Sequence, residues 1–104
     1  MVSIHDLIVN NLIFRVQGTK EQPHPELEQT ADPRLAIWIK DYDIRTDDLN
    51  RILDHIRDAI ALAAVIRQGD KSLFIELNTD QGIELPPGLL KKLAEVDCTI
   101  EIHS

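Results

Sequence analysis

The chain has 104 residues, of which 43% are hydrophobic and 28% charged, so it can form one modest core and is too hydrophobic for a disordered protein. Its 18 acidic and 11 basic side chains give a net charge of −7, which disfavours binding to nucleic acid or anionic membranes and suits a basic partner. The single cysteine excludes an internal disulfide. Without a signal-peptide pattern or an apolar run long enough for a membrane span, we expect one cytoplasmic domain over residues 1–104.

The first clear element is a strand over residues 12–17. Apolar residues recur at every second position of this segment, which indicates a strand with one buried face. The residues predicted to be buried are Leu12, Phe14 and Val16. Residues 1–11 before the strand suit a short helix or another strand equally well. The segment 19–33 after it contains three prolines and several charges, so the sequence predicts a long, mobile loop there.

A second strand is predicted over residues 35–40. Leu35, Ile37 and Ile39 fall on one side of this strand, which we expect to be buried. Trp38 falls on the other side.

A long helix is predicted next, with Thr46 as its N-cap and Gly69 just beyond its end. Its first half is amphipathic. Its second half, from Ala59 to Ile66, is apolar on all sides, which indicates that the rest of the domain or another copy of the chain covers it.

Two more strands, at 72–78 and 98–103, and a short helix that begins at Pro86-Pro87 complete the chain. Because every predicted strand alternates, we expect helices to cover one face of the sheet and the other face to remain open. The expected fold class is α+β. It is a two-layer sandwich, with a mostly antiparallel sheet of about four strands and two helices on one face.

The alternation also predicts which side chains occupy the open face. Aromatic rings are expected there among carboxylates, and aromatic residues are enriched at protein interfaces. The residues expected on this face are Trp38, Phe74, Glu76, Thr99, Glu101 and His103. Further candidate contacts, in the turn after the third strand, are Asp80 and Glu84.

The sequence predicts no catalytic, cofactor or metal site. Cys98 falls on the apolar side of its strand, which is typical of a buried thiol. The four histidines lack the spacing of metal ligands on a helix, and the four glycines form no phosphate-binding loop. Glu76 and Glu101 could meet as an acid–base pair on adjacent strands, although solvated or interface carboxylates are commoner. We therefore expect a protein that is not an enzyme.

The carboxy-terminal half contains the distinctive stretch Gly82-Ile83-Glu84-Leu85-Pro86-Pro87-Gly88-Leu89-Leu90. From Asp47 to the end, the order of long helix, strand, this stretch and closing strand resembles the carboxy-terminal half of a bacterial family catalogued as a domain of unknown function, number 4279. The resemblance assigns no catalytic residue to this chain. Members of that family resemble, in size and acidity, the immunity proteins encoded beside bacterial toxins.

Three functional hypotheses follow. The leading one is a small cytoplasmic immunity or inhibitor protein that occludes the active cleft of a basic toxin such as a nuclease, because acidic and aromatic side chains complement a phosphate-binding cleft. The second is a homo-oligomeric structural or scaffolding module, such as a homodimer, that associates through Ala59–Ile66. The third is a small-ligand or enzyme site built on the open face from Glu76, Glu101 and His103.

Overall fold

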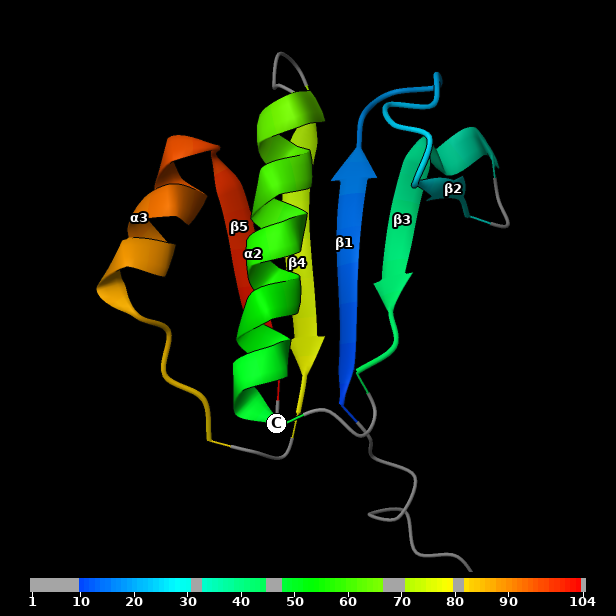
Figure 1. Cartoon of the computed structure of the whole chain (residues 1–104). Coiled ribbons are helices and arrows are strands. Elements are labelled where there is room, and N and C mark those ends of the chain that lie inside the picture. Colours follow the sequence, from blue (N-terminus) through cyan, green and yellow to red (C-terminus); the bar gives the residue numbers. More distant parts are fainter. Residues whose placement is uncertain (1–9, 31–32, 45–47, 67–70, 80–81, 104) are drawn as a thin grey trace, which may run out of the picture.

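A five-stranded sheet forms one layer of the molecule, with the strands in the order β2-β3-β1-β4-β5 (Figure 1). The computed structural model describes residues 10–30, 33–44, 48–66, 71–79 and 82–103. All neighbouring strands are antiparallel except β4 and β5, which are parallel and joined through a helix. The strands are β1 (Asn11–Gln17), β2 (Glu28–Gln29), β3 (Ile37–Tyr42), β4 (Ser72–Asn78) and β5 (Cys98–His103).

The second layer consists of the helices α2 (Leu49–Ile66) and α3 (Pro87–Glu95), which lie on the same face of the sheet (Figure 1). The Asp48 carboxylate accepts a hydrogen bond from the backbone N–H of Arg51 at 3.0 Å and so caps the start of α2. Thr46, the predicted N-cap, lies outside the described residues. The predicted α+β fold, with a mostly antiparallel sheet and two helices on one face, is confirmed.

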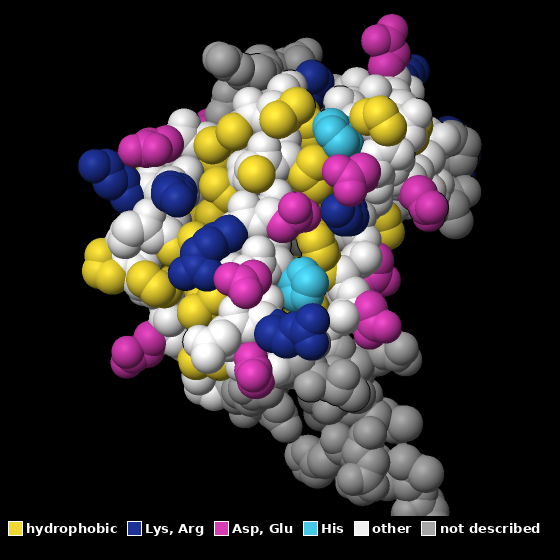
Figure 2. Space-filling view, viewed as in Figure 1, with side chains coloured by type: hydrophobic (Ala, Val, Ile, Leu, Met, Phe, Trp, Pro, Cys, Tyr) yellow, Lys and Arg dark blue, Asp and Glu magenta, His cyan; other side chains and the backbone are white. Residues whose placement is uncertain are grey.

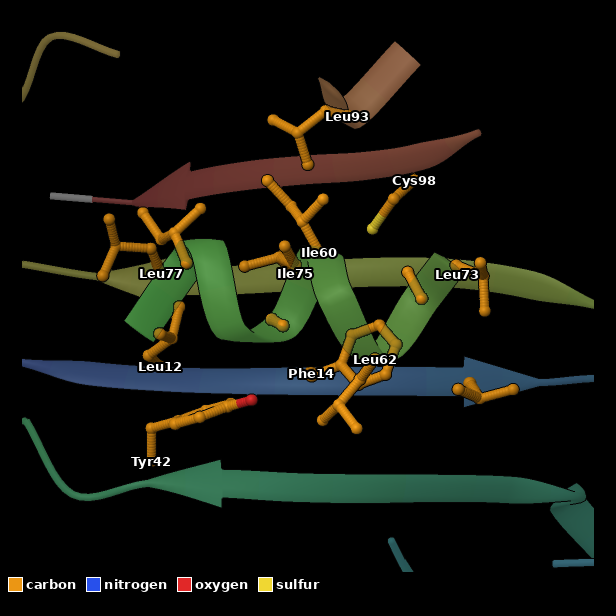
Figure 3. Close-up of a cluster of buried hydrophobic side chains, with 14 of the residues drawn as sticks. Leu12, Phe14, Tyr42, Ile60, Leu62, Leu73, Ile75, Leu77, Leu93 and Cys98 are labelled. Carbon is orange, nitrogen blue, oxygen red and sulfur yellow. The ribbon is translucent and has the colours of Figure 1, made fainter. Parts of the chain in front are cut away.

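The core lies between the sheet and α2. Leu12, Phe14 and Val16 of β1 are fully buried, and they meet the buried residues of β4 and α2 in one cluster. Figure 3 shows Ile60 and Leu62 of α2 against this layer. Burying a large apolar side chain contributes roughly 1.5–3 kcal/mol, so the alternation of β1 gives the sheet a strong preference for one face.

Strand β3 differs from its prediction in bounds and in phase. The pairing of Val16 with Trp38 and of Leu12 with Tyr42 places both aromatic side chains on the helix-covered face, where they are buried. The placement of Trp38 on the open face is therefore wrong. Leu35, expected in the strand, belongs to a short 3-10 turn (Pro33–Leu35) and is exposed. The chain enters β3 through Ala36, whose φ of 51° interrupts the extended backbone that the sequence pattern implied.

The segment predicted to be a long loop contains more structure than expected. Within it, β2 pairs with β3, and Leu27 is fully buried in the core. The Gln22 side chain donates a hydrogen bond to the carbonyl oxygen of Leu27 at 2.8 Å. One buried leucine thus fixes this segment beside the sheet, although few of its residues are apolar.

The apolar half of α2 is largely covered within the chain. Ala59, Ile60, Leu62, Ala63 and Ile66 are buried, whereas Val65 is 67% exposed. Figure 2 shows hydrophobic side chains at the surface of this helical layer among charges of both signs. Most of the apolar run therefore serves the core.

Candidate protein-binding face

The candidate site is the face of the sheet opposite to α2 and α3, which we call the open face. Residues paired across neighbouring strands lie on the same face of the sheet, and the side chains of this face point away from the core. No helix among the described residues covers it. The residues of the open face, from β2 to β5, are Glu28, Ile37, Ile39, Asp41, Asn11, Ile13, Arg15, Gln17, Ser72, Phe74, Glu76, Asn78, Thr99, Glu101 and His103.

Arg15, Phe74 and Glu76 form the centre of the open face. The Arg15 guanidinium lies over the Phe74 ring, 4.6 Å from its centroid, and forms an ion pair with the Glu76 carboxylate. The side chains of Arg15 and Glu76 are only 22% and 27% exposed, so neighbouring side chains shield this pair from water. A cation–π contact and a shielded ion pair together hold three side chains in one arrangement.

The open face carries a net negative charge. Among the described residues it has four carboxylates (Glu28, Asp41, Glu76 and Glu101) and one guanidinium. The strand register places Glu101 directly beside Glu76. The His103 Nε2 atom lies 3.7 Å from a Glu101 carboxylate oxygen, an ion pair only when the histidine is protonated.

Apolar side chains lie between these charges. Ile13, Ile37, Ile39 and Phe74 are neither buried nor fully exposed, and they belong to the three central strands. The register aligns Ile39, Arg15 and Phe74 in one row across the sheet. Partly exposed apolar surface surrounded by charge is typical of a surface that binds another protein.

A groove of about 250 Å³ borders the open face at the β2–β3 edge. It is lined by Glu26, Glu28, Ile39, Lys40 and Asp41. Neither Glu28 nor Asp41 has an ion-pair partner among the described residues, whereas Glu26 is paired with Lys40 at 2.9 Å. The groove therefore offers carboxylates to a cationic side chain.

A polar cluster on the helix-covered side fixes Lys40 at this edge. The Tyr42 hydroxyl donates a hydrogen bond to Asp58 Oδ2 at 2.6 Å, and Lys40 Nζ lies 3.3 Å from the same oxygen. The hydrogen bond from Tyr42 and the charge of Lys40 lower the pKa of the Asp58 carboxyl despite its partial burial.

The other two groups of this cluster remain protonated. Burial and the Asp58 hydrogen bond raise the pKa of Tyr42. Burial lowers the pKa of Lys40, but its bonds to Glu26 and Asp58 outweigh that effect, so the net shift is upward. Since each group is held in its ordinary charge state, this cluster is suited to joining β3 to α2 and not to proton transfer.

The structure brings four of the predicted site residues together, namely Phe74, Glu76, Glu101 and His103. Trp38 lies on the opposite face, where its indole N–H donates to the Thr19 carbonyl oxygen at 3.0 Å. Glu84 is exposed in the segment before α3, apart from the sheet, and Asp80 lies outside the described residues.

Sequence reasoning missed several members of the open face. They are Ile13, Arg15, Glu28, Ile39 and Asp41. The alternation of β1 already assigned Ile13 and Arg15 to the side opposite Phe14, so a signal for those two existed. No comparable signal existed for Ile39 and Asp41, because the phase of β3 depends on its pairing with β1. Glu28 lies in a strand too short for any period to be recognised.

Cys98 is not available as a nucleophile. Its side chain is buried, and burial together with the nearby Asp97 charge raises the pKa of the thiol to about 12. At neutral pH the thiolate is therefore scarcely populated.

Comparison with models of protein families, with curated proteins and with solved structures finds no match to this chain. The resemblance to the domain of unknown function therefore stays a hypothesis. In the part of the chain that the structure describes, neither helix has the length and apolar character needed to cross a membrane.

Proposed function

We propose that this protein binds a basic protein partner through the open face. The observation that carries the proposal is the combination on one uncovered sheet of partly exposed apolar side chains, an Arg15–Phe74–Glu76 centre and an excess of carboxylates. A partner with Lys and Arg side chains around an apolar contact is complementary to it.

The arrangement of the open face suggests how the energy of binding is divided. Phe74 and the flanking isoleucines supply apolar area at the centre, whereas Asp41, Glu28 and Glu101 lie toward the rim. In known interfaces a few central residues dominate affinity, while rim charges mainly accelerate association. We expect Phe74 to control the dissociation rate and the carboxylates to control the association rate.

Inhibition of a toxin is the specific form that we propose for this binding. A nuclease presents a positively charged cleft to phosphate, and a rigid acidic sheet can occupy that cleft and exclude the substrate. The acidic character of the chain supports this proposal. So does the hypothesis that its carboxy-terminal half resembles a family whose members are similar in size and acidity to immunity proteins.

The proposal is tested by inhibition and binding measurements against purified basic nuclease domains of bacterial toxins, beginning with any encoded beside this chain. The decisive variant is the double charge reversal Asp41→Lys and Glu101→Lys. We expect association with an inhibited nuclease to slow by roughly tenfold or more at low salt, with a smaller loss at high salt.

The matched control is the double reversal Glu84→Lys and Glu95→Lys. It changes the net charge by the same amount at exposed positions outside the open face. If both double variants weaken binding equally, net charge and not the open face is responsible. If Phe74→Ala also leaves the dissociation rate unchanged, the open face is not the binding surface.

A further inference from the structure

The outer edge of β5 presents unpaired backbone groups. β5 is the last strand of the sheet, and its only strand partner among the described residues is β4. The N–H of Thr79 donates to the carbonyl oxygen of His103 at 2.9 Å, so the backbone groups of His103 point toward β4. Because the direction alternates along a strand, those of Ile100 and Ile102 point away from the sheet.

Exposed apolar side chains accompany this edge. Ile102 lies on the helix-covered side of the sheet, paired with Leu77, yet it is 42% exposed. Edge strands in soluble proteins are commonly protected by charges or prolines, and an exposed isoleucine at an open edge favours pairing with another strand.

Helix α3 continues the apolar surface beyond the edge. Lys92 and Glu95 of α3, and Val96 just after it, line a groove of about 290 Å³ with residues of α2, so Lys92 and Glu95 mark the side of α3 that faces α2. Leu90 and Ala94 lie on the opposite side of the helix, because successive residues are about 100° apart. Helix α3 lies at the β5 edge of the sheet (Figure 1). Leu90 is 48% exposed, and its position on the helix, opposite the side that faces α2, directs it away from the rest of the helical layer.

We propose that two copies of the chain pair antiparallel through β5, around a two-fold axis at Ile100, and form one continuous sheet. This register places Ile100 opposite its own copy and Cys98 opposite Ile102 of the second copy, so all pairs on the helix-covered side are apolar. On the open side, Thr99 lies opposite Glu101 of the second copy, and cross-strand pairs of that kind carry no charge repulsion.

Alternative registers are less favourable. An axis at Glu101 places two carboxylates directly opposite each other, which is destabilising. An axis at Ile102 leaves fewer residues of β5 (Cys98–His103) paired. The axis at Ile100 joins as long a stretch of β5 as the axis at Glu101, without placing two carboxylates opposite each other, and it lets the Leu90 sides of the two α3 helices approach each other.

The dimer has a consequence for binding. A two-fold axis perpendicular to the sheet keeps both open faces on the same side, so the pair presents two acidic faces to one partner or to two. Linked sites of this kind raise the overall affinity without any new contact within each site. The dimer itself does not depend on the proposed partner.

Sedimentation equilibrium of the full chain over a range of concentrations tests the dimer. We expect the mass to rise from one chain to two with concentration, and added salt to strengthen the dimer because each chain carries a net charge of −7. Ile102→Lys and Leu90→Lys should each shift the protein to a single-chain mass. Val65→Lys, a change at another exposed apolar residue, should leave the dimer intact.

Amide hydrogen exchange gives a readout for the edge itself. The amides of Ile100 and Ile102 should become protected as concentration rises, whereas those of Thr99 and Glu101, which face β4, should be protected throughout. A single-chain mass at every concentration would overturn the proposal. So would a dimer that survives Ile102→Lys, or one that Val65→Lys abolishes.

Discussion

The two phenylalanines of the chain lie on neighbouring strands and on opposite faces of the same sheet. Phe14 of β1 is fully buried beneath α2, whereas Phe74 of β4 lies partly exposed beneath the Arg15 guanidinium. The register pairs Phe14 with Ile75 and Arg15 with Phe74, so a shift of one residue along the strand changes a core position into a surface position. Folding stability and partner binding can therefore reside on different faces of one sheet.

The polar groups of the two faces differ in the same way. On the covered face, the indole N–H of Trp38 and the hydroxyl of Tyr42 each have a hydrogen-bond acceptor. On the open face, the Arg15 Nε atom is buried without a hydrogen-bond partner among the described residues. The aromatic polar groups on the covered face are therefore satisfied within the fold, whereas the Arg15 guanidinium is satisfied only in part by Glu76.

The largest expected effect compares these two aromatic residues directly. Phe14→Ala should lower the free energy of unfolding by about 3–5 kcal/mol, because it removes a buried ring and leaves a cavity. Phe74→Ala should cost about 1 kcal/mol or less, since its ring is partly solvated already. Urea unfolding of both variants measures the difference. Equal losses would mean that the open face is covered in the folded protein.

Tyr42→Phe should have the next largest effect. It removes the hydroxyl that donates to Asp58 and keeps the ring in the core, so we expect a loss of about 1 kcal/mol in the free energy of unfolding. Asp54→Asn, at an exposed carboxylate of the same helix, serves as a control and should change stability less. A Tyr42→Phe variant as stable as the parent would show that the hydrogen bond contributes nothing net.

The lowered pKa of Asp58 gives this contact a pH dependence. Because the carboxyl binds a proton less readily in the folded chain than in the unfolded chain, its stabilising effect is present above the ordinary aspartate pKa of 3.8. It is lost as the pH falls through the lowered folded value. The loss of stability on acidification should be smaller in Tyr42→Phe than in the parent protein, and parallel slopes would contradict the assignment.

The sequence predicted the two faces well wherever one apolar phase dominated. In β4, Leu73, Ile75 and Leu77 have no competing apolar series, so both the strand and its buried side were predicted correctly. In β3 two series compete, Ile37 with Ile39 and Trp38 with Tyr42. Their hydrophobicity cannot decide between them, because the choice depends on pairing with β1, whose residues lie well before β3 in the chain.

The centre of the open face depends even more on tertiary structure. Arg15 and Glu76 are separated by 61 positions in the sequence, and only the antiparallel pairing of β1 with β4 brings them together. Strand β2 has two residues, too few for any period to be recognised. The sequence could supply the buried side of strands with one dominant apolar series, such as β1 and β4, but it could not supply the phase of β3, the order of the strands or their register.

The Arg15–Glu76 pair should have a modest effect on stability. A double-mutant cycle with Arg15→Met and Glu76→Gln should give a coupling energy of about 0.5–1 kcal/mol, because the pair is shielded but not fully buried. Chemical unfolding of the parent, both single variants and the double variant provides the four free energies. A coupling energy near zero would mean that the pair does not stabilise the fold.

The smallest expected effect is that of the double reversal Asp41→Lys and Glu101→Lys on stability. Asp41 is exposed, Glu101 is only partly buried, and the parent chain has a net charge of −7, so relief of charge repulsion offsets the loss of local contacts. The free energy of unfolding should change by less than about 0.5 kcal/mol, as it should for Glu84→Lys with Glu95→Lys. If the two double variants are equally stable, a difference in their binding reflects the open face, because only Asp41→Lys and Glu101→Lys change that face. A large loss confined to Asp41→Lys and Glu101→Lys would place the open face within the stabilising structure of the fold, and the separation between the two faces would fail.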